Sequence, residues 1–175
     1  MNRSYPSNHY ALTKGRASPT TPVGQTRAIH LQGVESAPLQ TLAIAIAQDC
    51  SFVARGFAGD IEHLKSLLVE GVKHEGFSYI DVIQPCITWG KRPLSWYRER
   101  IDRIPSDHDP SDRRAALERA LDSGERMSIG VFYRNSRQPL FAERFRREVS
   151  AKPLASLRWP DQERIASFLA EFRRD

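Results

Sequence analysis

The sequence has few cysteines and no long apolar run. These two shortages argue against a disulfide-linked secreted protein and against a membrane-spanning protein. Only two of its 175 residues are cysteine, Cys50 and Cys86. Residues 1–13 are polar and carry no apolar leader, so the cysteines are expected to be cytoplasmic thiols or ligands rather than a secreted disulfide. No apolar stretch approaches the roughly 18–20 residues of a membrane-spanning helix, so no membrane partner is expected.

The sequence also lacks the short motifs that mark several large enzyme classes. It contains no GxSxG serine elbow, no HExxH zinc helix, no P-loop and no GxGxxG dinucleotide loop. It has neither zinc-finger spacing nor a basic motif with interleaved aromatic residues, so nucleic acid is not the expected partner. None of these signatures therefore assigns an activity to the chain.

Positive charge is what the sequence has in excess. It holds 26 Lys and Arg against 21 Asp and Glu, a net charge of +5 at neutral pH. Such a surface can meet nucleic acid, an acidic protein or an acidic redox carrier, or it can consist of ordinary solvated helix faces. Much of the excess is arginine and follows residue 90, in Lys91–Arg92, Arg98–Arg103, Arg113–Arg114 and Arg144–Arg147.

Between residues 39 and 83 the pattern predicts alternating helices and strands. Asp60 is suited to cap a helix whose apolar positions follow helical spacing up to Val72. Phe77–Ile83 is a short apolar run ending before Pro85, which is typical of a buried strand. The expected elements are a helix over 39–48, a strand over 51–55, a helix over 61–72 and a strand over 77–83.

Strand, helix and strand in close succession predict a βαβ unit with two parallel strands. Function in such sheets gathers beyond the carboxyl ends of the strands. The segments Gly56–Asp60 and Gln84–Gly90 are therefore the expected site.

The rest of the chain reads differently. Residues 1–37 show no sustained periodicity and are expected to be irregular. Beyond residue 90 we expect an extension that is largely helical, with helices over 95–104, 111–122 and 161–174 and one strand over 127–134. The fold class is thus α/β, a partial parallel-sheet domain followed by a helical C-terminal extension.

A few residues are candidates for chemistry. Cys86 follows a strand at its carboxyl end, so it is either a ligand that needs partners from elsewhere or a plain loop thiol. Cys50, just before a strand, is expected to be a small buried hydrophobe. His63 and His74 are too far apart on one helix to share a ligand. Lys14 has flexible neighbours and is either a surface lysine or a group for an anionic ligand.

Several motifs, in order, resemble the β subunits of 2-oxoacid:ferredoxin oxidoreductases. The likeness runs from about residue 10 to about 150, and it does not extend to residues 151–175. It rests on LTKGRASPTTP at 12–22, SFVARGFAGDIEHL at 51–64, HEGFS at 74–78, IDVIQPC at 80–86, SWYRER at 95–100, HDPSD at 108–112 and IGVFY at 129–133.

The resemblance implies an enzyme that oxidatively decarboxylates a 2-oxoacid to its acyl-CoA and passes electrons to ferredoxin. Its implied cofactors are thiamine diphosphate, Mg²⁺ and a [4Fe–4S] cluster, and its implied partners are an α subunit and ferredoxin. Cys86 matches one cluster ligand of the family. Tyr10, Leu12 and Thr13 match its cofactor-binding loop, with Thr13 and Lys14 near the reactive end. The substrate is expected to be 2-oxoglutarate or a broad set of 2-oxoacids, pyruvate among them.

The sequence also departs from that family. It has no Gly-Asp-Gly-Asp for Mg²⁺ and no Cys-x-x-Cys for the cluster, and Ser7 stands where the family has a metal-binding Asn. Residues 1–90 are expected to match the C-terminal part of the thiamine-diphosphate domain, and 91–175 the β-subunit extension. Alone, the chain is expected to be inactive and to need a separate N-terminal β fragment. The alternative is a non-catalytic protein, or a relic, that keeps only docking surfaces.

Overall fold

The computed structural model describes residues 9–10, 15–27, 29–86, 92–122, 124–138, 143 and 161–171. Residues 1–138 form one compact unit and residues 139–175 another. The predicted division at residues 90 and 91 follows the family resemblance rather than compactness, and it stays a prediction. No helix within the described ranges is long and apolar enough to cross a membrane.

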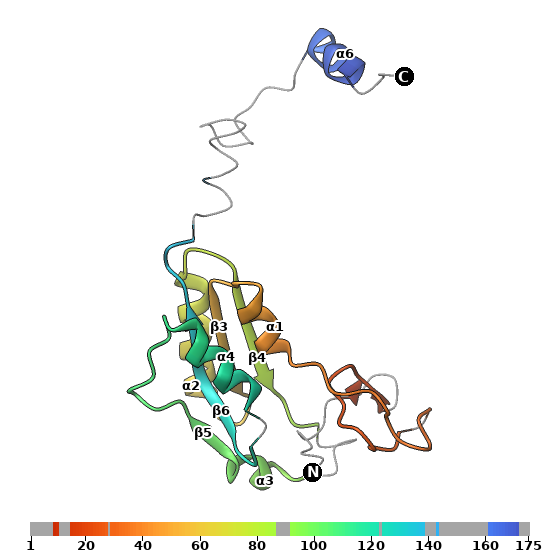
Figure 1. The fold of residues 1–175 in the computed structure, drawn as a ribbon, viewed down its shortest axis with the longest axis vertical. Helices are drawn as coiled ribbons and strands as arrows, with labels where there is room; N and C mark the ends of the chain where they lie inside the picture. The colour runs from red at the N-terminus through yellow and green to blue at the C-terminus, as the bar shows by residue number, and fades with distance from the viewer. Residues whose placement is uncertain are drawn as a thin grey trace. The chain divides into compact units, whose positions relative to one another are not determined.

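The predicted βαβ unit is the centre of the first compact unit (Figure 1). Strand β3, Phe52–Phe57, is followed by helix α2, Ile61–Lys73, and strand β4, Ser78–Ile83. β3 and β4 are parallel and in continuous register from Phe52↔Ser78 to Phe57↔Ile83. Asp60 caps α2 as predicted, because its side chain accepts a hydrogen bond from the backbone N–H of His63.

The segment after residue 90 contributes strands to the same sheet, which the sequence did not predict in full. Strand β6, Met127–Arg134, was predicted, and it pairs antiparallel with β3, a pairing that the sequence did not predict. A further short strand, β5, Ile101–Arg103, pairs parallel to β6. The described sheet therefore has the order β4-β3-β6-β5 and contains both parallel and antiparallel pairs. The segment after residue 90 thus contains strands as well as helices.

The helix predicted over 95–104 is wrong beyond its first turn. Helix α3 covers only Leu94–Arg98, and the chain then enters β5. Ile101 pairs with Met127 of β6 and packs on the cluster around Tyr97, so a non-local strand partner overrides the local helical pattern.

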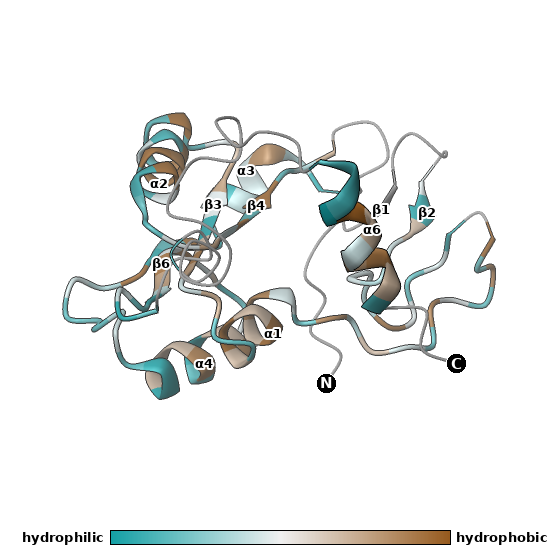
Figure 2. Ribbon diagram, turned by 90° about the horizontal axis from the view of Figure 1, so that it is seen from above, coloured by the Kyte–Doolittle hydropathy of each residue, from teal (hydrophilic) through white to brown (hydrophobic). Residues whose placement is uncertain are grey.

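Helices cover both faces of the sheet (Figure 2). Helix α1, Thr41–Ala47, and helix α4, Arg113–Leu121, lie on one face, and α2 lies on the other. Leu42 and Ile46 of α1 are fully buried against Val53 and Phe132, where each large apolar side chain contributes about 1.5–3 kcal/mol. α4 presents mainly its small residues, Ala116 and Ala120, to that core.

Helix α2 lies close to the sheet because it places Gly71 against the strands. A Cβ at Gly71 would come within 2.8 Å of Ile80 Cδ1 and 3.5 Å of Phe52. Leu67 is the large buried residue of this side, packed with Phe52 and Ala54. The same helix leaves four apolar side chains exposed, at Ile61, Leu68, Val69 and Val72.

Strand β4 differs from the prediction of a buried strand. Its residues are half-buried and Val82 is exposed, because among the described residues only β3 pairs with it and its other side is an edge. Beside its start lies a cavity of about 530 Å³, lined largely by α1 and by Phe77, Tyr79 and Gln138.

The remaining elements are small. Within residues 1–37, predicted to be irregular, His9–Tyr10 and Arg16–Ala17 form a two-residue antiparallel pair, β1 and β2. In the second unit, helix α6, Gln162–Glu171, agrees with the helix predicted from residue 161. Its Ile165, Phe168 and Leu169 are exposed apolar residues at helical spacing.

Candidate functional site

The carboxyl ends of β3 and β4 meet at one edge of the sheet, where the sequence predicts the site. Phe57 ends β3 opposite Ile83 at the end of β4, and the Ala58 N–H donates to the Ile83 carbonyl at 3.0 Å. Because parallel strands bring their following loops to the same edge, Asp60 and Cys86 both belong to it. We call this part of the molecule the carboxyl edge.

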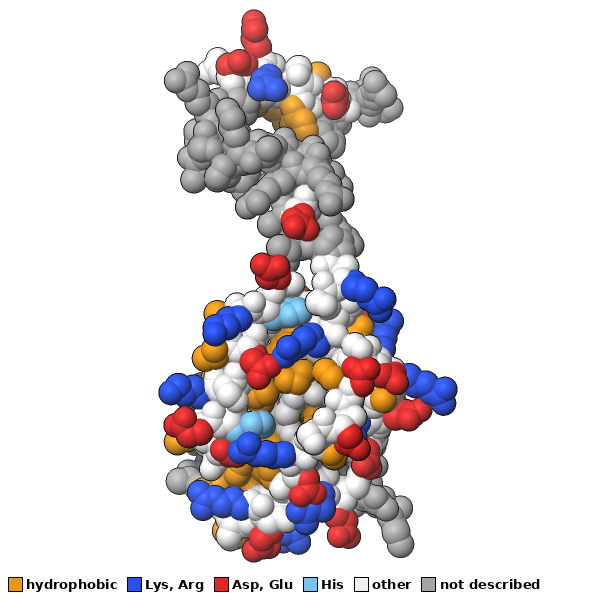
Figure 3. Space-filling model, turned by 90° about the vertical axis from the view of Figure 1, so that its left-hand side faces the viewer, with side chains coloured by type: hydrophobic (Ala, Val, Ile, Leu, Met, Phe, Trp, Pro, Cys, Tyr) orange, Lys and Arg blue, Asp and Glu red, His pale blue; other side chains and the backbone are white. Residues whose placement is uncertain are grey.

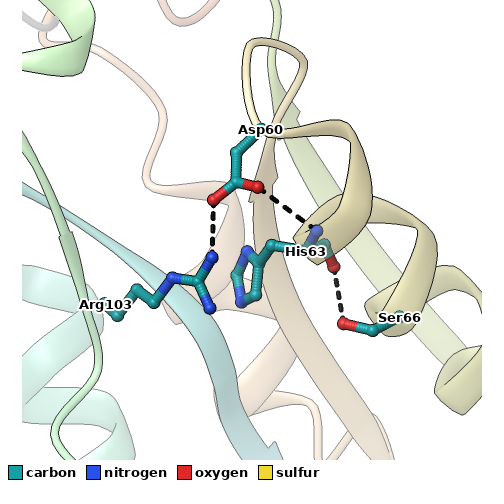
Figure 4. Close-up of polar contacts among 4 residues, drawn as sticks. All are labelled: Asp60, His63, Ser66 and Arg103. Carbon is teal, nitrogen blue, oxygen red and sulfur yellow. Dashed lines mark hydrogen bonds and ion pairs between the residues drawn. The ribbon is translucent and has the colours of Figure 1, made fainter.

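Asp60 is the polar centre of the carboxyl edge (Figure 4). Its carboxylate accepts from the His63 N–H at 3.3 Å and from the Arg103 guanidinium at 2.8 Å. Burial alone would raise the pKa of Asp60, but the hydrogen bonds from Arg103 and His63, with the guanidinium charge, outweigh it and lower that pKa. Asp60 therefore stays ionised and joins α2 to β5.

The His63 ring lies beside the Arg103 guanidinium in the first turn of α2 (Figure 4). Its Nδ1 atom is buried and has no hydrogen-bond partner among the described residues. Burial lowers the pKa of His63, and the charge of Arg103 lowers it further. The ring is thus a neutral imidazole near neutral pH, with one nitrogen left unsatisfied.

An aromatic cluster closes the carboxyl edge from the side of α3. Tyr97 is only 1% exposed and stacks on Phe57, with 6.4 Å between ring centroids. Met127 and Ile129 of β6 complete the buried cluster, and Ile83 at the end of β4 packs against it. The extension therefore packs against the carboxyl ends of β3 and β4.

The two cysteines have different surroundings. Cys50 is buried and, as predicted, part of the core, with its Sγ donating to the carbonyls of Phe52 at 3.3 Å and Phe77 at 3.4 Å. Burial raises the pKa of the Cys50 thiol, which makes it a poor ligand. Cys86 is half-buried and lies three residues beyond β4.

The other predicted residues divide between described and undescribed positions. Tyr10 lies in β1, paired with Arg16 of β2. Leu12, Thr13 and Lys14 lie outside the described residues. Within the described ranges, no three His, Cys, Asp or Glu side chains are grouped closely enough to hold a metal ion.

His74 and His108 have structural contacts. His74 Nε2 is 3.0 Å from Ser51 Oγ, and its ring lies 5.5 Å from that of Phe52. His108 Nε2 is 2.9 Å from the Phe132 carbonyl oxygen, which lies 24 residues away in the sequence. Both therefore brace the sheet instead of forming a site.

Arg103 is the functional candidate that sequence reasoning missed. It was assigned to the end of a helix, whereas β5 directs it towards Asp60. No local signal identifies this pairing, since 43 residues separate the two side chains in sequence.

Comparison with known proteins shows one consistent family. The family model for the C-terminal region of the pyruvate ferredoxin oxidoreductase beta subunit matches residues 86–148. The 2-oxoacid:ferredoxin oxidoreductase subunit beta of Sulfolobus sp is 37% identical over 151 residues, covering 78% of this chain and 49% of that protein. The protein of the same name from Saccharolobus solfataricus is 34% identical over 150 residues, covering 77% of this chain and 48% of the relative.

A solved structure agrees with these likenesses. It is a 2-oxoglutarate:ferredoxin oxidoreductase from Magnetococcus marinus with 2-oxoglutarate, coenzyme A and succinyl-CoA bound. It matches with a TM-score of 0.76 at 29% identity, over 91% of this chain and 54% of that one. The chain thus spans about half the length of the relatives it matches. On sequence and fold together, the chain belongs to the family of 2-oxoacid:ferredoxin oxidoreductase β subunits.

Proposed function

We propose that this chain serves as part of a β subunit that, with an α subunit, oxidatively decarboxylates a 2-oxoacid to acyl-CoA and passes electrons to ferredoxin. The observation that carries the proposal is the fold match over 91% of the chain to an enzyme of that kind. The family likeness favours this function over a non-catalytic docking protein. The thiols of Cys50 and Cys86 fit the cytoplasmic setting that the proposal includes.

The proposed substrate is 2-oxoglutarate or a broad set of 2-oxoacids. The Magnetococcus marinus structure with 2-oxoglutarate bound supports the first. By resemblance, Lys14 would pair with a substrate carboxylate and Thr13 would lie beside it, which is testable by substitution. A Lys14→Ala enzyme is expected to lose affinity for 2-oxoglutarate more than for pyruvate, because pyruvate has one carboxylate fewer.

The chain's residues do not by themselves fit an iron–sulfur cluster. A [4Fe–4S] cluster is held by four Cys thiolates. The sequence has two cysteines, and the Cys50 Sγ is committed to the carbonyls of Phe52 and Phe77. Cys86, at the carboxyl edge, is thus the single thiolate that this sequence can offer, and the other ligands would come from outside it.

The same holds for Mg²⁺ and thiamine diphosphate. Mg²⁺ takes an octahedral set of oxygen ligands in which carboxylates supply charge. The sequence has no Gly-Asp-Gly-Asp segment, and the described carboxylates form no group suited to a metal. Tyr10, Leu12 and Thr13 would line the cofactor only where another polypeptide segment supplies the metal ligands.

The direct test is assembly with the missing components. The chain would be co-expressed with an α subunit and a β segment that carries the Cys-x-x-Cys and Gly-Asp-Gly-Asp motifs. We expect CoA-dependent reduction of ferredoxin by a 2-oxoacid, and iron, sulfide and thiamine diphosphate in the purified complex. Absence of both activity and cofactors in a correctly assembled complex would overturn the proposal.

A matched pair of cysteine variants sharpens the test. In the assembled complex, Cys86→Ser is expected to lose most of the bound iron, because it removes a thiolate ligand. Cys50→Ala is expected to keep the iron, because that thiol is buried in the core and donates to backbone carbonyls. Equal iron content in the two variants would contradict the role of Cys86.

A further inference from the structure

The segment Arg92–Arg103 gathers positive charge beside the carboxyl edge. Its four basic residues are all arginine, and its two acidic residues are Glu99 and Asp102. Asp102 is engaged in a two-pronged ion pair with Arg126, and Glu99 lies 3.4 Å from Arg100. The segment therefore keeps a net positive charge. We call Arg92, Trp96, Arg98, Arg100 and Arg103 the arginine surface.

One indole ring holds two of these cations. The Arg100 Cζ lies 4.3 Å from the Trp96 ring centroid, and the Arg92 Cζ lies 5.3 Å from it. The ring attracts each guanidinium, but the two guanidiniums repel one another. An incoming carboxylate would accept from either guanidinium, and its charge would offset theirs.

The Trp96 ring under these arginines packs against a buried neighbour. Trp96 packs edge-on against Tyr97, with 5.3 Å between ring centroids, and Tyr97 is anchored in the core on Phe57. Arg100 is further held by a hydrogen bond from its guanidinium to the Trp96 carbonyl at 3.3 Å. A pre-ordered surface loses less side-chain entropy when it binds a partner.

The arginine surface adjoins the proposed site. Arg103, with its side chain 65% exposed, belongs both to the surface and to the carboxyl edge through Asp60. Arg92 follows Cys86 by six residues, so their Cα atoms lie at most about 20 Å apart. On the face shown in Figure 3, Lys and Arg are interspersed with Asp and Glu.

We propose that the arginine surface docks an acidic protein, the electron carrier that the proposed function requires. The inference rests on that function and adds the place and chemistry of carrier binding. Arginine and tryptophan are the residues that concentrate binding energy at protein interfaces. Arginine forks match the carboxylates of Asp and Glu, and complementary charge speeds the encounter.

The test is a binding measurement on the assembled enzyme with an acidic ferredoxin as the probe. The double variant Arg92→Glu/Arg100→Glu is expected to raise the Kd for ferredoxin on the order of tenfold at low salt. It is also expected to flatten the weakening that added salt produces with the unchanged enzyme, since fewer charge pairs remain to be screened. An unchanged Kd and salt dependence would overturn the proposal.

Two controls keep the result interpretable. Arg114→Glu reverses one charge on α4, half the charge change of the double variant, at a side chain that is 89% exposed and pairs with Glu118. It should leave the ferredoxin Kd within about twofold. Arg92→Gln/Arg100→Gln serves if the charge reversal prevents folding, with a smaller rise expected. If Arg114→Glu lost as much ferredoxin affinity as the double variant, the loss would be an effect of net charge rather than of the arginine surface, and the proposal would be overturned.

The alternative partner and the parent function are tested separately. If a DNA duplex binds the enzyme and competes with ferredoxin, and the double variant loses DNA but keeps ferredoxin, the surface is a nucleic-acid site and the proposal fails. If the unchanged enzyme binds ferredoxin but shows no 2-oxoacid-dependent reduction, the proposed function fails while the docking surface stands.

Discussion

The two ends of strand β3 differ in how completely their polar groups are paired. At the amino end, the Asp49 carboxylate accepts from the Tyr133 hydroxyl at 2.8 Å and from the side-chain amides of Asn135 and Gln138. Hydrogen bonding from Tyr133 and Gln138 lowers the pKa of Asp49. Ser51 Oγ donates to the Phe77 carbonyl and contacts His74. This end is a closed network that holds the fold together.

The carboxyl end is left incomplete. There His63 Nδ1 is buried without a partner among the described residues, and Arg103 is exposed although it pairs with Asp60. Groups at this end can still accept a ligand, whereas those around Asp49 cannot do so without breaking bonds. The amino end of β3 therefore holds residues that stabilise the fold, and the carboxyl end holds residues available for function. Each prediction below tests residues at one of these two ends.

The largest effect is expected at Asp49. Asp49→Ala removes the acceptor for three side chains and places alanine at a φ of 57°, where Asp and Asn are tolerated better. We expect the free energy of unfolding to fall by about 3 kcal/mol, measured by urea denaturation. Asp49→Asn should lose about 1 kcal/mol, and the exposed Asp107→Ala less than about 0.5 kcal/mol. Equal losses of unfolding free energy for Asp49→Ala and Asp107→Ala would show that the hydrogen bonds of Asp49 do not stabilise the fold.

Gly76 should give the next largest effect. Its φ is 153°, and a Cβ there would collide with Ser51 Oγ and approach His74 Nε2. Gly76→Ala is expected to cost about 2 kcal/mol and to disturb the Ser51–His74 contact, visible in the histidine NMR signals. Gly24→Ala is the matched control, because its φ of 76° is also positive but nothing lies within 4 Å of the added Cβ. That control should cost only about 1 kcal/mol, from the backbone alone.

At the carboxyl end, Asp60 should have smaller and separable roles. Asp60→Ala loses the helix cap and is expected to cost about 1 kcal/mol in thermal or urea unfolding. Asp60→Asn keeps a capping oxygen and loses only the ion pair with Arg103, worth about 0.5 kcal/mol at this exposure. Arg103→Gln should match Asp60→Asn. If Asp60→Asn lowered the free energy of unfolding as much as Asp49→Ala does, the two ends of β3 would not differ in their contribution to stability.

The pH dependence should be the smallest effect. Burial lowers the pKa of both His63 and His74 in the folded chain below the ordinary 6.5 of the unfolded chain. Between the folded-state and unfolded-state pKa of each histidine, the unfolded chain therefore binds more protons than the folded one. The histidine contribution is therefore complete above about pH 6.5 and is lost as pH falls through that window. The carboxyls with lowered pKa act only below about pH 4. Urea midpoints at pH 7 and 5 should show the decline, and His63→Gln should flatten it.

The fold was predictable where contacts are local and not where they are distant. Helical spacing and the Asp60 cap predicted α2, and the apolar run before Pro85 predicted β4. The sequence did not reveal β5, because Ile101 becomes strand only through its pairing with Met127. For the same reason the pairing of Asp60 with Arg103 and of Asp49 with Tyr133 was missed. Cys86 was found by its position after a strand, and its role as a ligand stays a prediction.

The antiparallel pairing of β3 with β6 has a consequence for synthesis on the ribosome. Val53 at the centre of the sheet pairs with Tyr133, so β3 emerges long before the strand that pairs with it and completes its core. At roughly 5–20 residues per second, the nascent βαβ unit waits several seconds with that edge of β3 unpaired. During this interval the growing chain is most exposed to aggregation, and chaperone binding to residues 50–83 should be strongest before residue 134 leaves the exit tunnel.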